Sequence, residues 1–281
     1  MKGFNNGLVT TLFLTVIVAQ ACKEQAPTAN VIVTTFAGST AGYADGNGTE
    51  AKFNSPTGIT VDASGNVYVA DLLNSKIRKI TPDGTVSTVA GTTAGYLDGA
   101  STDAKFDKPV DVALDVNGNI IVADYSNFKI RKIDSNGIVT TVAGSTQGYA
   151  DGPALSAMFY YPSVLTIGQD GVIYVAEPDH LIRKITTDGT VSTLAGNTNN
   201  GYIDGAGVNA EFYLPSGLAV DANSNVYVAD YHNNAIRKID KFGVVSSFVG
   251  GANEFAMSNG TVSSTLFASM PAMRKRLSAC S

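Results

Sequence analysis

Residues suited to covalent or metal chemistry are scarce in this sequence. Its cysteines are Cys22 and Cys280 alone, which excludes the disulfide framework of a small secreted domain. Its two histidines, His180 and His232, fall short of the three protein ligands usual in a catalytic zinc site. The GxSxG motif of a serine nucleophile and a phosphate-binding loop are also absent. The sequence therefore predicts no catalytic residue, no metal site and no cofactor, and favours a protein that is not an enzyme.

Positive charge and long apolar runs are scarce as well. The 19 Lys and Arg residues are outnumbered by 24 Asp and Glu residues, which gives a net charge of −5. Non-specific nucleic-acid binding needs a cationic surface that releases counterions, so nucleic acid is not expected as a partner. The apolar stretch from Leu8 to Ala19 holds about a dozen residues, whereas a membrane-spanning helix needs roughly 20. Later segments show no helical periodicity, which points to an all-β fold.

That short apolar stretch belongs to a segment, residues 1–22, that is laid out like a secretory signal. Lys2 precedes the stretch, and small residues precede Cys22. The end resembles a lipobox, in which the cysteine is acylated and becomes the first residue of the exported protein, although Ala19 stands where leucine is usual. We predict a signal peptide over 1–22 and lipidation of Cys22. An ordinary cleaved signal with an incidental cysteine is the alternative.

Residues 23–30 (KEQAPTAN) are polar, contain Pro27, and are predicted to form a tether. A lipid on Cys22 would anchor the protein while leaving the domain itself in water. The sequence thus predicts export to the cell envelope, facing the periplasm or on the cell surface. The lipid anchor would be the only contact with the membrane.

Internal repetition is the strongest signal in the remaining residues, 31–281. Four similar segments end at glycines that recur about every 53 residues: Gly91, Gly144, Gly196 and Gly250. The first segment, GITVDASGNVYVADLLNSKIRKITPDGTVSTVAG, begins at Gly58. A second repeated stretch lies between the segments: GYADGNGTEAKFNSP, GYLDGASTDAKFDKP, GYADGPALSAMFYYP and GYIDGAGVNAEFYLP.

Each repeat is predicted to contain four strands separated by turns rich in Asn, Asp, Ser and Gly, such as SGN and PDG. Short strands at spacings of about 8–12 residues indicate an all-β fold. Four-strand units that repeat roughly every 40–50 residues indicate the blades of a β-propeller. We predict four complete blades, followed by an incomplete fifth repeat over 251–281. The blades are placed at 57–91, 110–144, 163–196 and 216–250.

The pattern VYVAD-x3-N-x-x-IRKI, followed by DG and TVAG, resembles the NHL repeat. With the GYxDG loop included, residues 31–271 resemble the bacterial extracellular NHL-repeat proteins, including lipoproteins. This resemblance implies a propeller of six blades, so four complete repeats suggest a chain truncated from six. A genuine short propeller is the rival interpretation. The resemblance implies little about activity, because propellers of this kind serve many unrelated functions.

Both ends of the repeat region bear on how the propeller closes. Residues 31–38, VIVTTFAG, match a fourth strand and are expected to complete the last blade. After Gly250 another repeat begins, with Phe267 and Pro271 as its F-x-x-P segment. The final residues, AMRKRLSACS, depart from the pattern.

Charged residues recur at two strand positions of every blade. An acidic residue ends the second strand: Asp71, Asp124, Glu177 and Asp230. A basic pair lies in the third strand: Arg78–Lys79, Arg131–Lys132, Arg183–Lys184 and Arg237–Lys238. Because these positions repeat in every blade, we interpret them as structural ion pairs within or between blades. A charged ring that docks a partner is the alternative.

The GYxDG loops supply a candidate binding rim: Tyr43, Asp45, Tyr96, Asp98, Tyr149, Asp151, Tyr202 and Asp204. Asp-Gly suits a turn, and the phenylalanine that follows each loop is predicted to plug it onto the blade. A ring of tyrosines on one face would also suit recognition, since aromatic residues are enriched in binding surfaces. Residues 45–50 faintly resemble a calcium loop, but the other three copies lack the equivalent Asn and Glu.

Positions that break the repeat are not explained by blade architecture. Glu177, Pro178 and His180 accompany a one-residue deletion in the third repeat, and His232 lies in a similar hairpin of the fourth. We predict an exported scaffold that offers one propeller face to a protein, peptide or glycan. The alternatives are a propeller enzyme of lyase or lactonase type with a hub metal (calcium or zinc), and a truncated fragment without function.

Overall fold

A computed structural model describes residues 32–251. The predicted signal peptide with Cys22, the tether 23–30 and all but the first residue of the incomplete repeat 251–281 lie outside the described residues. The chain divides into two compact units, and the unit that begins at Thr35 contains every strand within 32–251. No helix in this described part is long and apolar enough to cross a membrane.

The strands form four antiparallel sheets of five strands each. The first sheet contains β1 (Gly46–Asn47), β2 (Pro56–Val61), β3 (Val67–Asp71), β4 (Lys76–Ile80) and β5 (Thr85–Ala90). The second contains β6 (Gly99–Ala100), β7 (Pro109–Leu114), β8 (Ile120–Asp124), β9 (Lys129–Ile133) and β10 (Ile138–Ala143). The third contains β11 (Gly152–Pro153), β12 (Val164–Ile167), β13 (Ile173–Ala176), β14 (Ile182–Ile185) and β15 (Thr190–Ala195). The fourth contains β16 (Gly205–Ala206), β17 (Pro215–Val220), β18 (Val226–Asp230), β19 (Ala235–Ile239) and β20 (Val244–Gly250).

Short 3-10 helices accompany three of these sheets. They are η1 (Gly48–Glu50), η2 (Leu72–Asn74), η3 (Tyr125–Asn127), η4 (Gly207–Asn209) and η5 (Tyr231–Asn233). Of these, η2 joins β3 to β4, η3 joins β8 to β9, and η5 joins β18 to β19.

Turn chemistry sets the ends of the strands. In the turn between β2 and β3, Asp62 Oδ1 accepts hydrogen bonds from the backbone N–H groups of Ser64 and Asn66, each at 2.9 Å. Hydrogen bonding from the Asn66 side chain lowers the pKa of Asp62. Gly65 takes the left-handed conformation that this turn requires, with φ of +83°. The Asp-x-x-Gly-Asn sequence therefore closes the hairpin by itself.

Each sheet has one strand more than the four that the sequence predicts. The additional strand comes from the GYxDG loop and is two residues long: in the second sheet, β6 pairs antiparallel with the start of β10. Asp98, just before β6, accepts a hydrogen bond from the Thr141 backbone N–H at 3.1 Å, which lays the loop along the outer strand. Two residues are too few to show the alternation by which a strand is recognised in a sequence.

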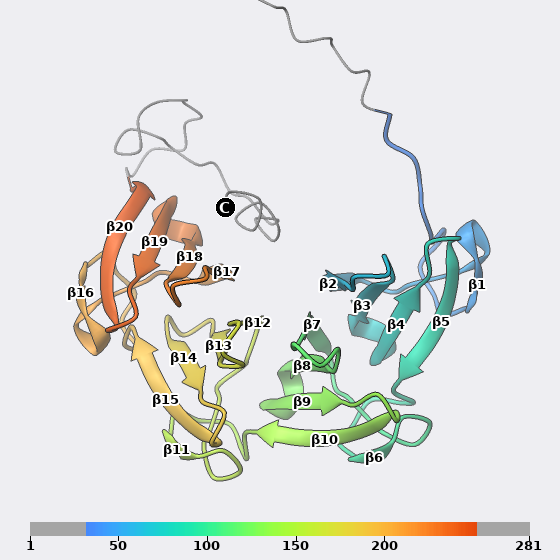
Figure 1. Ribbon diagram of the computed structural model, residues 1–281, viewed down its shortest axis with the longest axis horizontal. Helices are drawn as coiled ribbons and strands as arrows, with labels where there is room; N and C mark the ends of the chain where they lie inside the picture. The colour runs from blue at the N-terminus through green and yellow to red at the C-terminus, as the bar shows by residue number, and fades with distance from the viewer. Residues whose placement is uncertain (1–31, 252–281) are drawn as a thin grey trace, which may run out of the picture. The chain divides into compact units, whose positions relative to one another are not determined.

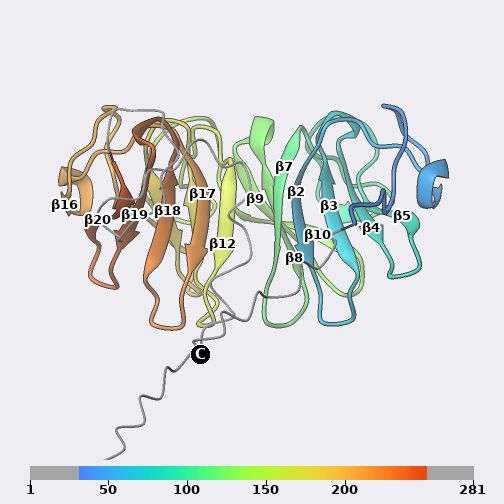
Figure 2. The ribbon, with the colours of Figure 1, turned by 90° about the horizontal axis from the view of Figure 1, so that it is seen from above.

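The four sheets follow one another in chain order around a common centre (Figure 1). The innermost strands are β2, β7, β12 and β17, and each contacts the next. The short strands lie at the outer edges. In Figure 2, where the strands run vertically, two sets of loops lie at opposite ends of the sheets. The predicted all-β propeller with four blades is confirmed, and the sheets are blades one to four.

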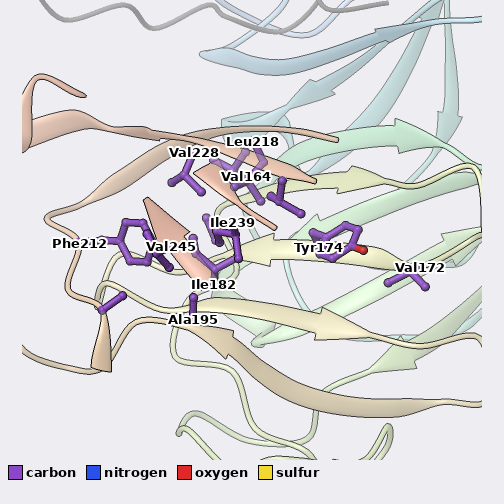
Figure 3. Packing of buried hydrophobic residues seen from close by; sticks show 13 residues of the cluster. Val164, Val172, Tyr174, Ile182, Ala195, Phe212, Leu218, Val228, Ile239 and Val245 are labelled. Carbon is purple, nitrogen blue, oxygen red and sulfur yellow. The ribbon is translucent and has the colours of Figure 1, made fainter. Parts of the chain in front are cut away.

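The hydrophobic core lies between the blades, because the strands bury both of their faces. On β8, Ile120 packs in the cluster shared with blade one, and its neighbour Ile121 packs in the cluster shared with blade three. Figure 3 shows the cluster between blades three and four, to which Ile182, Phe212 and Val228 belong. Side chains alternate between the two faces of a strand, so strands such as IIVAD are apolar at successive positions.

The strand expected over 31–38 is not formed in its described part, residues 32–38. Instead, the Gly38 N–H donates to Gly48 O at 3.0 Å, as the Gly91 N–H donates to Ser101 O in blade two. Gly38 thus occupies, before blade one, the position that Gly91 at the end of blade one occupies before blade two. A strand needs a hydrogen-bonded partner, and no strand within 32–251 pairs with this segment.

Candidate functional site

A buried arginine binds two carboxylates in every blade. The inner pairs are fully buried and measure 2.7 to 2.9 Å: Arg78–Asp71, Arg131–Asp124, Arg183–Glu177 and Arg237–Asp230. The outer carboxylates come from the GYxDG loops and remain 38 to 47% exposed: Asp45, Asp98, Asp151 and Asp204. The predicted pairing of these charges within blades is confirmed. Glu177 therefore has the same structural part as the aspartates of the other blades.

The arginine also fastens the loop backbone to the blade. In blade two, Arg131 donates from Nη1 to Lys105 O at 3.1 Å and from Nη2 to Leu97 O at 2.9 Å. Burial raises the pKa of Asp124 to about 6, while hydrogen bonds from Asn127 and Arg131 act in the opposite direction. The Arg131 guanidinium group thus joins Asp124 at the end of β8 to Leu97 in the GYxDG loop and to Lys105, which follows that loop.

The phenylalanine after each loop packs beneath this arginine. Phe106, Phe159 and Phe212 are fully buried, whereas Phe53 is partly buried. The arginine Cζ atoms lie 4.9 to 5.2 Å from the ring centroids. The prediction that these rings plug the loops onto the blades is confirmed.

The candidate rim residues lie along the outer strands. Besides the arginine, each rim aspartate accepts a hydrogen bond from an outer-strand N–H, at Thr88, Thr141, Thr193 and Ser247 in turn. The four rim tyrosines keep 40 to 51% of their surface exposed. Three of them hydrogen-bond the outer strand through Oη, whereas Tyr149 donates to Asp179 instead. Burial and this hydrogen bond raise the pKa of Tyr149.

Aromatic side chains gather at one end of blades two to four, where the F-x-x-P segments meet the turns before β9, β14 and β19. The tyrosine–histidine band consists of Tyr125, Tyr149, Tyr160, Tyr161, His180, Tyr213, Tyr231 and His232. Its first group centres on Tyr161, whose ring centroid lies 4.6 Å from that of Tyr125 and 5.0 Å from that of Tyr160. Tyr160 in turn stacks on Tyr149 at 5.2 Å. These rings hold one another in fixed orientations.

The second group of the band centres on Tyr213. Its ring centroid lies 5.6 Å from that of His180 and 4.6 Å from that of His232, and Tyr231 lies 4.7 Å from His232. The two histidines, which the sequence marks as departures from the repeat, therefore flank one tyrosine. Burial lowers the pKa of His180.

The shortened turn of blade three, residues 178–180, joins the two groups. Asp179 accepts the hydrogen bond from Tyr149 in the first group. His180 belongs to the second group, and its Nδ1 accepts a hydrogen bond from the Leu214 N–H at 3.1 Å. The deletion that breaks the repeat thus lies at the middle of the aromatic band.

Residues 53–80, 106–133 and 212–239 match the NHL repeat. The chain is a β-propeller that contains NHL repeats. The three matches lie in blades one, two and four, and each runs from the phenylalanine plug to the end of the strand that carries the arginine.

The proteins that this chain resembles have diverse names. Teneurin-4 of Mus musculus is 30% identical over an alignment of 228 residues, and the alignment covers 70% of this chain and 8% of teneurin-4. A protein of unknown function from Bacteroides thetaiotaomicron is 22% identical, with a TM-score of 0.50 over 84% of this chain and 68% of that one. Catalytically inactive virginiamycin B lyase from Staphylococcus aureus, with quinupristin, is 21% identical, with a TM-score of 0.50 over 69% and 58%. At these identities the two structures show the fold alone.

Sequence reasoning missed most of the band in this NHL propeller. Tyr160 and Tyr161 stand in the F-x-x-P segment where blade one has Asn54 and Ser55, and Tyr213 stands at the same place in blade four. These tyrosines occupy the positions of the F-x-x-P segment that vary between repeats, so a comparison of the residues that the repeats share does not single them out.

One buried acid near the hub was also missed. Asp111 lies on β7 at the position that Gly58 holds in blade one and Gly217 in blade four. Its Oδ2 accepts a hydrogen bond from the Leu165 N–H of blade three at 2.9 Å. A Cβ atom on Gly58 would lie 2.2 Å from Asp111 Oδ1, so blade one can approach only through glycine. Asp111 therefore joins the innermost strands of blades two and three.

Residues 32–251 contain no group of three or more His, Cys, Asp or Glu side chains that could hold a metal ion. In the segment that faintly resembles a calcium loop, Asp45 Oδ1 lies 2.6 Å from Arg78 Nη2. At the other end of the blades, Asp115, Lys132 and Asp170 line a cavity between blades two and three. No residue of the rim or of the tyrosine–histidine band lines that cavity.

Proposed function

We propose that this NHL-repeat propeller is an exported binding protein of the cell envelope, anchored by a lipid on Cys22, that takes a polypeptide or glycan partner on the tyrosine–histidine band. The band is the observation that carries the proposal. Its eight rings are half-buried or exposed and orient one another, which lowers the entropy lost when a partner binds. Aromatic residues are also enriched where proteins recognise one another.

The contrast with the repeated residues supports this assignment. The arginines, inner carboxylates and phenylalanines occur in every blade and are explained by blade construction. The band is confined to blades two to four. Apart from Tyr149, which belongs to a GYxDG loop, its residues stand at positions that do not keep an aromatic side chain in every blade, so blade construction does not account for them.

Replacing Tyr213 by alanine is expected to abolish most binding to this face, because Tyr213 contacts both histidines. The full-length chain, purified in detergent, would be applied to arrays of random peptides and of glycans. Tyr43→Ala is the matched control, since Tyr43 is an exposed tyrosine of blade one outside the band. If Tyr43→Ala lost the same ligands and Tyr213→Ala retained them, the rim and not the band would be the binding surface.

The anchor has its own test. Cells fed an alkyne-tagged fatty acid are expected to label the wild-type chain and the Cys280→Ser variant, but not Cys22→Ser. The Cys22→Ser protein should also leave the membrane fraction, because a thioether-linked lipid cannot form on serine. Equal labelling of Cys22→Ser would disprove lipidation at this residue.

A further inference from the structure

Blades one and two bind ammonium groups of their own. In blade two, Lys129 Nζ lies 4.7 Å from the centroid of the Tyr96 ring and donates a hydrogen bond to Ser145 O. In blade one, Lys76 lies 4.7 Å from the Tyr43 ring in the same way. A tyrosine face with a backbone carbonyl beside it is thus the arrangement with which this propeller holds a primary ammonium group.

Blades three and four keep the tyrosines without the lysines. Leu181 and Ala235 stand at the positions of Lys76 and Lys129. A second lysine position lies against the first glycine of each GYxDG loop. Lysine is lost there as well, since Lys52 and Lys105 in the first two blades are replaced by Met158 and Glu211 in the last two. Both positions therefore lose positive charge between the two halves of the propeller.

The loss of lysine leaves an excess of acid around the band. In blades one and two, an arginine and a lysine accompany the two carboxylates. In blades three and four, one arginine accompanies two carboxylates, and Asp179 adds another beside Tyr149. An excess of acid suits a ligand that brings positive charge.

We infer that the band on blades three and four, together with Tyr202 of the rim, binds a basic polypeptide segment. Its lysine ammonium groups lie against tyrosine faces as Lys76 and Lys129 do in the other blades. This inference rests on the proposed function and names its ligand. Charge complementarity selects the ligand, because a neutral glycan would gain only stacking and a polyanion would be repelled by the acid excess.

A fluorescein-labelled peptide of alternating lysine and glycine is the probe, titrated with the full-length protein in detergent and followed by fluorescence anisotropy. We expect binding that weakens as sodium chloride is raised, because salt screens exposed charges. The same peptide with acetylated lysines keeps its length but loses the ammonium groups, and it is expected not to bind.

Variants that restore lysine to the fourth blade give the sharpest test. Ala235→Lys and Glu211→Lys supply the ammonium groups that blades one and two already carry, and each is expected to weaken peptide binding about tenfold. Ala222→Lys adds the same single charge as Ala235→Lys, at an exposed turn at the other end of the blade, and is expected to change binding little. Because Ala235 is buried and Glu211 is not, Glu211→Lys decides the matter should Ala235→Lys fail to fold.

The outcomes separate this inference from the function on which it rests. Equal binding of the acetylated peptide, or equal weakening by Ala222→Lys, would overturn the basic ligand. So would a lysine peptide that fails to bind while other peptides or glycans bind in a Tyr213-dependent manner, and the proposed function would then stand. If no peptide or glycan bound in a Tyr213-dependent manner, the proposed function itself would be overturned.

Discussion

Replacing Arg131 by methionine is expected to lower the free energy of unfolding by about 3 to 5 kcal/mol, because a buried carboxylate loses its cation. Arg131 and Asp124 have fully buried side chains. The variant would also leave Lys105 O and Leu97 O without the donors that Arg131 supplies. Urea denaturation of the purified protein, followed by far-ultraviolet circular dichroism, measures the change.

The neighbouring residue provides the control for this experiment. Lys132 lies on the same strand and keeps partial exposure, so Lys132→Met is expected to change stability by no more than about 0.5 kcal/mol. A cost below about 1 kcal/mol for Arg131→Met would mean that the buried ion pair barely repays its desolvation. The arginine would then have to be explained by specificity of loop placement and not by stability.

Replacing Phe159 by alanine is expected to cost about 3 to 5 kcal/mol, since it empties a ring-sized volume between blades two and three. Phe159 is fully buried in the cluster that contains Ile130 and Ala143 of blade two. Its ring also lies under Arg183, with the Cζ atom 5.1 Å from the ring centroid. Thermal and urea unfolding of the same sample would report the loss, with a lowered midpoint and an unchanged slope.

The first repeat supplies a matched control at the same motif position. Phe53 is only partly buried against the cluster of Ala51, Val69, Ile80 and Val86, so Phe53→Ala is expected to cost clearly less than Phe159→Ala. Equal costs for the two variants would show that the ring acts within its own loop. The junction between neighbouring blades would then contribute little at this site.

These two predictions concern residues that recur in every blade, whereas Tyr213 and Glu211 of the proposed binding face stand at positions that vary between repeats. The distinction makes the variants separable in practice. Arg131 and Phe159 variants are expected to report on folding, and Tyr213 or Glu211 variants on binding. A Tyr213 variant that unfolded like Phe159→Ala would place Tyr213 in the frame instead.

The repeats determined the four blades and the charged pairs without any structure. Hairpin turns such as the one at Asp62 close through hydrogen bonds between near neighbours, so the local sequence is sufficient to predict them. The apolar second strands were predictable for a similar reason, because a strand covered on both faces needs apolar residues throughout. The recurrence of Asp124 and Arg131 in four copies was enough to predict an ion pair.

Only the tertiary structure decided which side chains of different blades meet. Tyr125 and Tyr161 come from blades two and three, and His180 and Tyr213 come from blades three and four. The hydrogen bond from the Leu165 N–H to Asp111 likewise joins two blades. No local pattern specifies such contacts, because they depend on how far each sheet twists and how closely the next one packs against it. The same holds for the short fifth strands, which form only when a loop is laid along an outer strand by its aspartate.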